Sequence, residues 1–151
     1  MSDVPSGESR AAEIDVKEVP PLLLRMIPES ADSIEELFEQ PAEAAVLAEE
    51  AWMRLYWLLI ECFTTPVLMP ELESGDPDTE LLGRCWDFVE CIVAHPSALV
   101  SGAVHFEVLE PLLNAAGLVE AAWPYMRDRT RTETVRMLDG YGVRLRGINR
   151  R

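Results

Sequence analysis

Apolar residues along most of the chain recur at helical rather than strand spacing. The longest such stretch, residues 42–63, contains neither glycine nor proline, and its apolar positions return at close to the helical period. These positions are Val46, Leu47, Trp52, Leu55, Tyr56, Leu58, Leu59, Ile60, Cys62 and Phe63. The pattern predicts one long central helix from Ala42 to about Phe63, buried nearly all round in its second half. We expect Thr64-Thr65-Pro66 to end it.

Shorter elements are predicted around this central segment. Residues 22–27 form a short apolar helix between prolines, and residues 34–39 place three apolar side chains on one helical face. Residues 66–78 contain three prolines and several acidic side chains, and we expect them to be the main connecting loop.

The remainder of the chain also has helical patterning. Asp78 or Thr79 is expected to cap one helix and Ser97 the next, because each precedes an apolar run. Short helices over residues 118–126 and 130–140 follow, and no window shows the alternation of a strand. The predicted fold class is therefore all-α, an irregular bundle of about five to seven helices.

One internal similarity suggests a more ordered architecture. Residues 67–72 (VLMPEL) resemble residues 108–113 (VLEPLL) at a spacing of 41, which is typical of helical-hairpin repeats. The pairs Glu61-Cys62 and Glu90-Cys91 suggest a spacing of 29 instead. Since the two registers conflict, stacked helical hairpins remain an alternative to a plain irregular bundle.

The 151 residues suit one domain with polar ends. We expect residues 1–18 to be a flexible acidic segment, residues 19–140 a helical domain, and residues 141–151 an arginine-rich tail. The start lacks the apolar stretch of a secretory signal and no apolar run is long enough for a membrane span, so a soluble, cytoplasmic protein is expected. The three cysteines lie in apolar segments and are predicted to be reduced core residues: Cys62, Cys85 and Cys91.

Charge is distributed very unevenly along the chain. Residues 1–80 hold 19 acidic and four basic side chains, within a total net charge of −14. Residues 127–151 instead hold eight arginines and three acids. Such asymmetry points to electrostatic recognition of a partner. The arginines could contact phosphates, but an acidic protein repels nucleic acid as a whole, and we expect no nucleic-acid partner.

No arrangement of residues that carries a known chemistry is apparent. Cys85, Cys91 and His95 could supply three zinc ligands, but paired short cysteine spacings are missing, so we expect no metal. His105 and Glu107 are two residues apart and point away from each other on a helix. No nucleophile elbow, phosphate loop or dinucleotide fingerprint is present. We therefore expect no catalytic residues, no cofactor and no enzymatic activity.

The tryptophans are expected to be core residues, although one exposed on a helix face would be an interface anchor: Trp52, Trp57, Trp86 and Trp123. Taken with the acid-rich first half and the acidic loop, these tryptophan-rich helices resemble the small acidic helical immunity proteins encoded beside bacterial polymorphic toxins. The likeness is one of type and carries no specific motif. It implies a non-enzymatic protein that neutralises a basic toxin domain by occluding its active cleft. The alternative is an adaptor or scaffold subunit that binds a peptide or helix of a partner.

Two acidic clusters are the candidate partner-binding sites. The first is the loop, where prolines reduce the entropy lost on docking: Glu71, Glu73, Asp76, Asp78 and Glu80. The second is an acidic helix face: Glu35, Glu36 and Glu39. The competing interpretation of the loop is a solvated connector whose acids favour the N-terminus of the next helix.

Overall fold

The computed structural model describes residues 14–150, and over these residues the chain is all-α, as predicted. When adjoining segments are joined, the described residues form nine helices, of which seven have seven or more residues. The α-helical segments are α2 (Val19–Met26), α3 (Ala31–Phe38), α4 (Ala42–Ala45), α5 (Glu49–Met53), α6 (Leu55–Leu59), α7 (Met69–Glu73), α8 (Thr79–Ile92), α9 (Ala98–Val104), α10 (Leu118–Ala122) and α11 (Asp128–Gly140). No described helix has the length and apolar character needed to cross a membrane.

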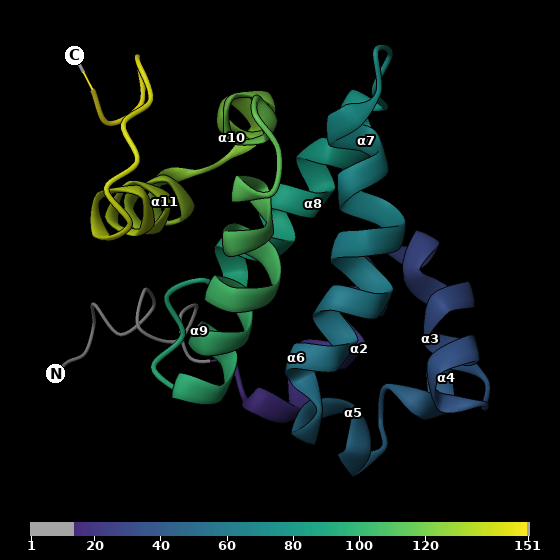
Figure 1. Cartoon of the computed structure of the whole chain (residues 1–151). Coiled ribbons are helices and arrows are strands. Elements are labelled where there is room, and N and C mark those ends of the chain that lie inside the picture. Colours follow the sequence, from purple (N-terminus) through teal and green to yellow (C-terminus); the bar gives the residue numbers. More distant parts are fainter. Residues whose placement is uncertain (1–13, 151) are drawn as a thin grey trace, which may run out of the picture.

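Two long rods form the middle of the bundle (Figure 1). In the first, a π-helical segment η3 (Ile60–Leu68) joins α6 to α7 without a break in helical backbone angles. In the second, a π-helical segment η4 (His105–Leu109) and a 3-10 segment η5 (Glu110–Leu113) continue α9. The rods lie side by side, because α6 packs against α9 and η4, and η3 packs against η4.

The prediction of one helix from Ala42 to Phe63 is wrong. The helix is interrupted between α4 and α5, and again at Arg54, where φ is −109° and ψ is 44°. Its apolar positions face different neighbours, since α4 packs against α2 and α3 while α6 packs against α9 and η4. Leu47, in the turn between α4 and α5, is left 76% exposed. The apolar positions of this stretch thus pack against two different sets of helices. The periodicity of the sequence cannot show that the stretch is divided between them.

The predicted stop at Thr64-Thr65-Pro66 is also wrong. Helical structure continues through Pro66 to Glu73, so the connecting loop is residues 74–78 rather than 66–78. A π-helical turn is wider than an α-helical turn, which gives the proline ring room beside the preceding turn. The segment is otherwise held by burial of its apolar residues against α3 and η4.

One structural feature recurs at the spacing of 41. Pro70 and Pro111 both begin the segment that follows a π-helical stretch, in α7 and in η5.

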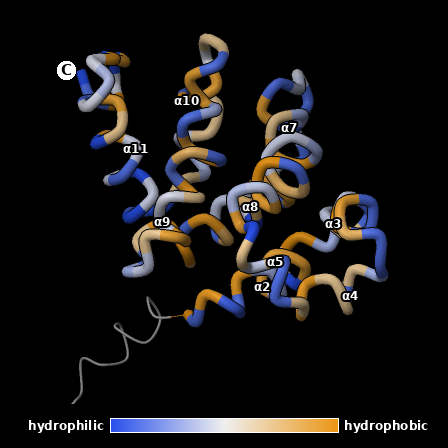
Figure 2. The backbone as a smooth tube through the Cα atoms, turned by 60° about the horizontal axis from the view of Figure 1, so that its bottom comes forward, coloured by the Kyte–Doolittle hydropathy of each residue, from blue (hydrophilic) through white to orange (hydrophobic). Residues whose placement is uncertain are grey.

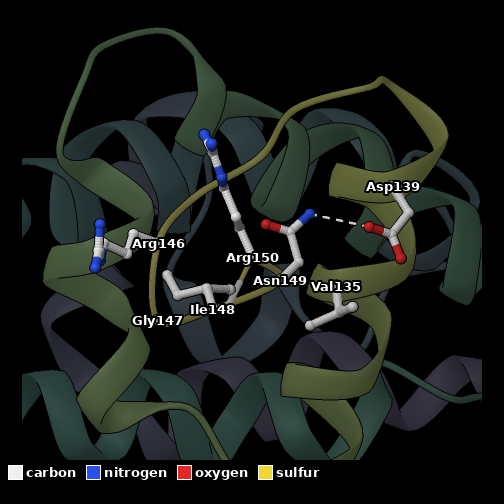
Figure 3. A pocket seen from close by; sticks show the side chains of 7 residues that line it. All are labelled: Val135, Asp139, Arg146, Gly147, Ile148, Asn149 and Arg150. Atoms are coloured by element: carbon white, nitrogen blue, oxygen red, sulfur yellow. Dashed lines mark hydrogen bonds between the residues drawn. The ribbon is translucent and has the colours of Figure 1, made fainter.

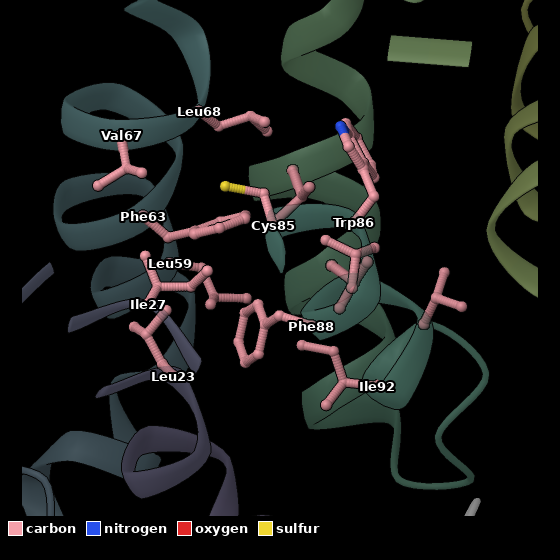
Figure 4. Packing of buried hydrophobic residues seen from close by; sticks show 14 of the residues in the cluster. Leu23, Ile27, Leu59, Phe63, Val67, Leu68, Cys85, Trp86, Phe88 and Ile92 are labelled. Atoms are coloured by element: carbon pink, nitrogen blue, oxygen red, sulfur yellow. The ribbon is translucent and has the colours of Figure 1, made fainter. Parts of the chain in front are cut away.

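The core lies where α2, η3 and α8 meet (Figure 4). Phe63 of η3 and Phe88 of α8 contact edge to face, with ring centroids 5.2 Å apart. Trp86 and Cys85 are fully buried in the same helix. Coloured by hydropathy, the backbone shows apolar and polar residues alternating along the helices (Figure 2). This burial is the main favourable contribution to folding.

Helix ends are closed by the caps that the sequence suggests and by one from another helix. Asp78 accepts a hydrogen bond from the backbone of Leu81, and Ser97 caps α9 in the same manner. At the start of α11, the carboxylate of Glu90 accepts hydrogen bonds from the backbone N–H groups of Arg129 and Thr130, both at 3.0 Å. Glu90 belongs to α8, so this cap joins two helices.

The two ends of the described chain are both packed against the bundle. Residues 1–13 of the predicted flexible segment lie outside the described residues, but residues 16–18 form a turn of 3-10 helix, η1 (Val16–Glu18). Asp15 and Glu18 form a reciprocal capping box there, which departs from the loose segment expected. At the other end, apolar residues of the arginine-rich tail pack against the core: Val143, Leu145 and Ile148.

Candidate functional site: acidic clusters, an exposed tryptophan and an aromatic cleft

Most carboxylates of the predicted acidic loop have structural contacts. Glu71 accepts a hydrogen bond from the backbone of Asp78 at 2.7 Å, and Asp78 caps α8. Glu80 and Glu29 bind the guanidinium of Arg84 from two sides, with N–O distances of 2.7 and 2.8 Å. These interactions tie the loop and α8 to η2 (Pro28–Ser30), which precedes α3.

The ion pairs around Arg84 are strong enough to shift its titration. Hydrogen bonds from Arg84 lower the pKa of Glu29, and the bonds to Glu29 and Glu80 raise the pKa of Arg84. Glu73 and Asp76 remain as exposed carboxylates at the tip of α7 and in the loop. The connector interpretation thus accounts for Glu71, Asp78 and Glu80, and only Glu73 and Asp76 are left to meet a partner.

The second acidic cluster lies along α3 and just beyond it. Glu35 accepts a hydrogen bond from the backbone N–H of Ala42 at 3.1 Å, which joins α3 to α4. Glu36 and Glu39 are exposed. Glu39 closes α3 in a left-handed conformation with φ of 56°, a position that usually belongs to glycine or asparagine. Figure 1 places this end of α3 beside α4, well away from the loop after α7.

Trp57 is exposed immediately beside that cluster. It is 39% exposed, and its ring contacts Phe38 of α3 edge to face at 6.3 Å. Phe38 lies between Glu36 and Glu39 in the sequence. Arg54 lies between α5 and α6. Its guanidinium is 4.9 Å from the centroid of the Trp57 ring and 3.4 Å from the carboxylate of Glu50. We call this surface the Trp57 patch: Glu36, Phe38, Glu39, Glu50, Arg54 and Trp57.

A second group of aromatic side chains extends from α6 across η4 to the end of α11. Tyr56 stacks on Phe106 at 6.3 Å, and Phe106 contacts His105 at 4.7 Å. His105 lies 6.2 Å from Tyr141, whose hydroxyl donates a hydrogen bond to Glu110. Phe106 and Tyr141 are 48% and 49% exposed.

Two adjoining cavities open beside this aromatic group. The larger, of about 280 Å³, is lined by residues of α8, α9, η4 and α11, among them Gly102, Phe106 and Glu133. The smaller, of about 190 Å³, is lined by Tyr141, Arg136 and Met137 together with His105 and Glu133, which line both cavities. We call the two together the His105 cleft.

Gly102 is required for the shape of this cleft. A Cβ atom at position 102 would lie 2.2 Å from the hydroxyl oxygen of Tyr56. Glycine therefore lets the Tyr56 ring approach α9 and reach Phe106. The hydrogen bond to Glu110 raises the pKa of Tyr141, so the phenol stays protonated at neutral pH. Tyr141 acts there as a hydrogen-bond donor rather than as a base.

The arginines of the last quarter line two other cavities. One of about 540 Å³ lies between α11 and the tail, with Arg146 and Arg150 around it (Figure 3). In the other, of about 670 Å³, Arg127 pairs with Asp87 at 2.6 Å and Arg129 lies 3.6 Å from Glu90. These acids belong to α8, so the arginines of α11 pair within the second half of the chain.

His95 is occupied by structural hydrogen bonds. One ring nitrogen donates to the carbonyl oxygen of Ile14, and the other accepts from the backbone N–H of Ser97 at 2.9 Å. Across residues 14–150, no three histidine, cysteine, aspartate or glutamate side chains form a group that could hold a metal ion. The cysteines in the same range are free thiols, with Cys62 and Cys85 buried and Cys91 half-buried.

The sequence interpretation missed the Trp57 patch and the His105 cleft. Trp57 falls outside the apolar stripe that contains Tyr56, and this offset was the available signal for its exposure. Phe106 stands between two polar residues, His105 and Glu107, and these neighbours were the available signal for its exposure. The contact of His105 with Tyr141 joins positions 36 residues apart and has no local signal. A scan against protein-family models and searches of curated proteins and of solved structures find no match to the chain.

Proposed function

We propose that this protein is a non-enzymatic, cytoplasmic binding domain that engages a basic protein, and that it acts as a bacterial immunity protein. In this role it neutralises a cognate toxin by covering the toxin's active cleft. The Trp57 patch supports the proposal most directly, because it combines an exposed tryptophan with a rim of carboxylates. Buried aromatic anchors surrounded by polar rims are typical of protein interfaces.

Charge favours a basic partner over a neutral or acidic one. The chain carries a net charge of −14. Glu50 pairs with Arg54, which lies over the Trp57 ring, and the exposed Glu36 and Glu39 belong to the same segment as Phe38, which contacts Trp57. Opposite charge accelerates diffusional encounter, which suits an inhibitor that must act before its toxin does damage. Glu39 supports the same assignment, since a left-handed backbone there would be less strained with glycine.

An adaptor that binds a partner's peptide or helix is the second candidate. The observation in its favour is the His105 cleft, a set of concave sites between η4 and α11 that could receive side chains from an extended or helical segment. The two candidates differ in outcome, because only an immunity protein abolishes the activity of its partner.

The proposal is tested by capturing partners from the native cell with the wild-type protein and measuring association with the captured protein. Trp57→Ala should raise the dissociation rate by about tenfold or more, the effect of removing an interface anchor. Glu39→Gly should slow association while leaving the fold at least as stable, because glycine relieves the left-handed backbone. Co-expression of the captured protein should be toxic with the Trp57→Ala variant and harmless with the wild type.

The matched control is the double variant Glu73→Lys, Asp76→Lys in the loop after α7. It leaves Glu71 in place, because Glu71 holds the backbone of Asp78. If this loop variant loses binding while Trp57→Ala retains it, the interface lies at the loop instead. A captured partner whose activity is unchanged by stoichiometric wild-type protein would overturn the immunity role and leave the adaptor.

A further inference from the structure

The His105 cleft has the size of a site for one side chain. Its two cavities measure about 280 and 190 Å³. Pockets for cofactors and drug-sized ligands occupy roughly 300–1,000 Å³. Each cavity by itself lies below this range and is large enough for a single side chain of a partner.

The lining favours a cation. Glu133 lines both cavities, and Glu110 accepts the Tyr141 hydrogen bond at the edge of the smaller one. The basic side chain among the lining residues described is Arg136, whose guanidinium lies 2.7 Å from Glu133. Aromatic faces attract cations through their quadrupole, and here Phe106 and Tyr141 expose such faces. In the larger cavity, which Arg136 does not line, an anion would meet the Glu133 carboxylate and the Phe106 ring.

The protein already pairs guanidinium groups with aromatic rings elsewhere. Arg54 lies 4.9 Å from the Trp57 ring, and Arg131 lies 4.7 Å from the Trp123 ring. At the cleft, Phe106 has no arginine over its ring among the described residues. Because a planar guanidinium both stacks on rings and binds carboxylates through paired donors, it matches this lining better than an ammonium group.

We propose that the His105 cleft binds an arginine side chain that projects from the basic protein partner. In the larger cavity, which Phe106 and Glu133 line together, the guanidinium stacks on the Phe106 ring and donates hydrogen bonds to Glu133. The inference rests on the proposed function, a domain that recognises a basic protein, and it adds a second contact to that of the Trp57 patch. Gly102 lines the larger cavity, and the Tyr56 hydroxyl lies close to it.

Nuclear magnetic resonance titration of the free protein with N-acetyl-arginine amide tests this inference. Saturable shifts are expected at His105, Gly102 and Gly140, which line the cleft. N-acetyl-citrulline amide has nearly the same shape without the charge, and it should bind about tenfold more weakly. Glu133→Gln should weaken the arginine probe about threefold or more, while Glu120→Gln on α10, an exposed glutamate outside the cleft, should leave it unchanged.

Equal affinity for the citrulline probe, or equal effects of Glu133→Gln and Glu120→Gln, would overturn the assignment. Tighter binding of putrescine than of the arginine probe would also overturn it, because the natural ligand would then be a free amine. Circular dichroism of each variant should match the wild type, since Glu133 is on the surface of α11. The experiment needs no partner protein, so it can fail while capture through Trp57 succeeds, and the reverse.

Discussion

The three thiols differ in their surroundings, and the difference sets their chemistry. Cys62 and Cys85 are fully buried, and burial raises the pKa of each to about 12 from an ordinary value of 9.0. Cys91 is half-buried, and burial with the charge of Asp87 raises its pKa as well. Only the thiolate is an effective nucleophile, so Cys62 and Cys85 are inert at neutral pH, and Cys91 is less reactive than an exposed thiol.

This environment predicts an order of thiol reactivity. In the native protein at pH 8, Cys91 should react with a chromogenic disulfide reagent well before Cys62 and Cys85, which react only through opening of the fold. Above pH 9 the unfolded chain loses these protons first, so stability that is complete below that pH should fall as the pH approaches 12. All three should react together in denaturant. Equal native rates for the three would contradict the burial seen here.

At the scale of elements, the contact between the two rods depends on one hydroxyl. Pro111 has no N–H, so it cannot donate the α-helical hydrogen bond to the carbonyl of Glu107, four residues before it. The hydroxyl of Thr64, buried in η3, donates to that carbonyl at 2.6 Å. The carbonyl that the proline of one rod cannot bond thus receives a hydrogen bond from a side chain of the other rod. Both residues of this bond lie in π-helical segments.

Replacing Thr64 by valine should therefore lower the stability of the fold, although the two side chains have nearly the same shape. Thr64→Val keeps the volume and leaves a partly buried carbonyl without this donor, which should lower the free energy of unfolding by about 1–3 kcal/mol. Thr65→Val is the matched control, because Thr65 is exposed, and it should change stability by less than about 0.5 kcal/mol. Denaturant unfolding measures both. Equal effects would mean that the hydroxyl does not couple the rods.

At the scale of the whole molecule, excess negative charge opposes the compact state. The net charge is −14, and exposed carboxylates such as Glu36, Glu39, Glu73 and Asp76 add to the repulsion. Salt screens repulsion between exposed charges beyond about 10 Å at 0.1 M ionic strength. The midpoint of thermal unfolding should therefore rise between low and moderate salt.

A variant tests whether these carboxylates are the source of that rise. Changing Glu36, Glu73 and Asp76 to their amides should raise the unfolding midpoint at low salt and reduce its dependence on salt. The melting curve followed by circular dichroism measures both quantities. A midpoint that falls with added salt would instead show that attractive pairs, such as those of Arg84, dominate the electrostatics.

The sequence by itself determined the helical class, the caps at Asp78 and Ser97, and the burial of Trp86, Cys62 and Cys85. These follow from local hydrogen bonding and from periodicity, which act over a few residues. Tertiary structure decided that the helix breaks before Leu55 and continues through Pro66, because neighbouring helices dictate which face must be buried. It also decided that Glu71 holds the backbone of Asp78, seven residues away, and that Glu29 of η2 binds Arg84 of α8. The Trp57 patch and the His105 cleft arise from residues distant in the chain, and only packing brings them together.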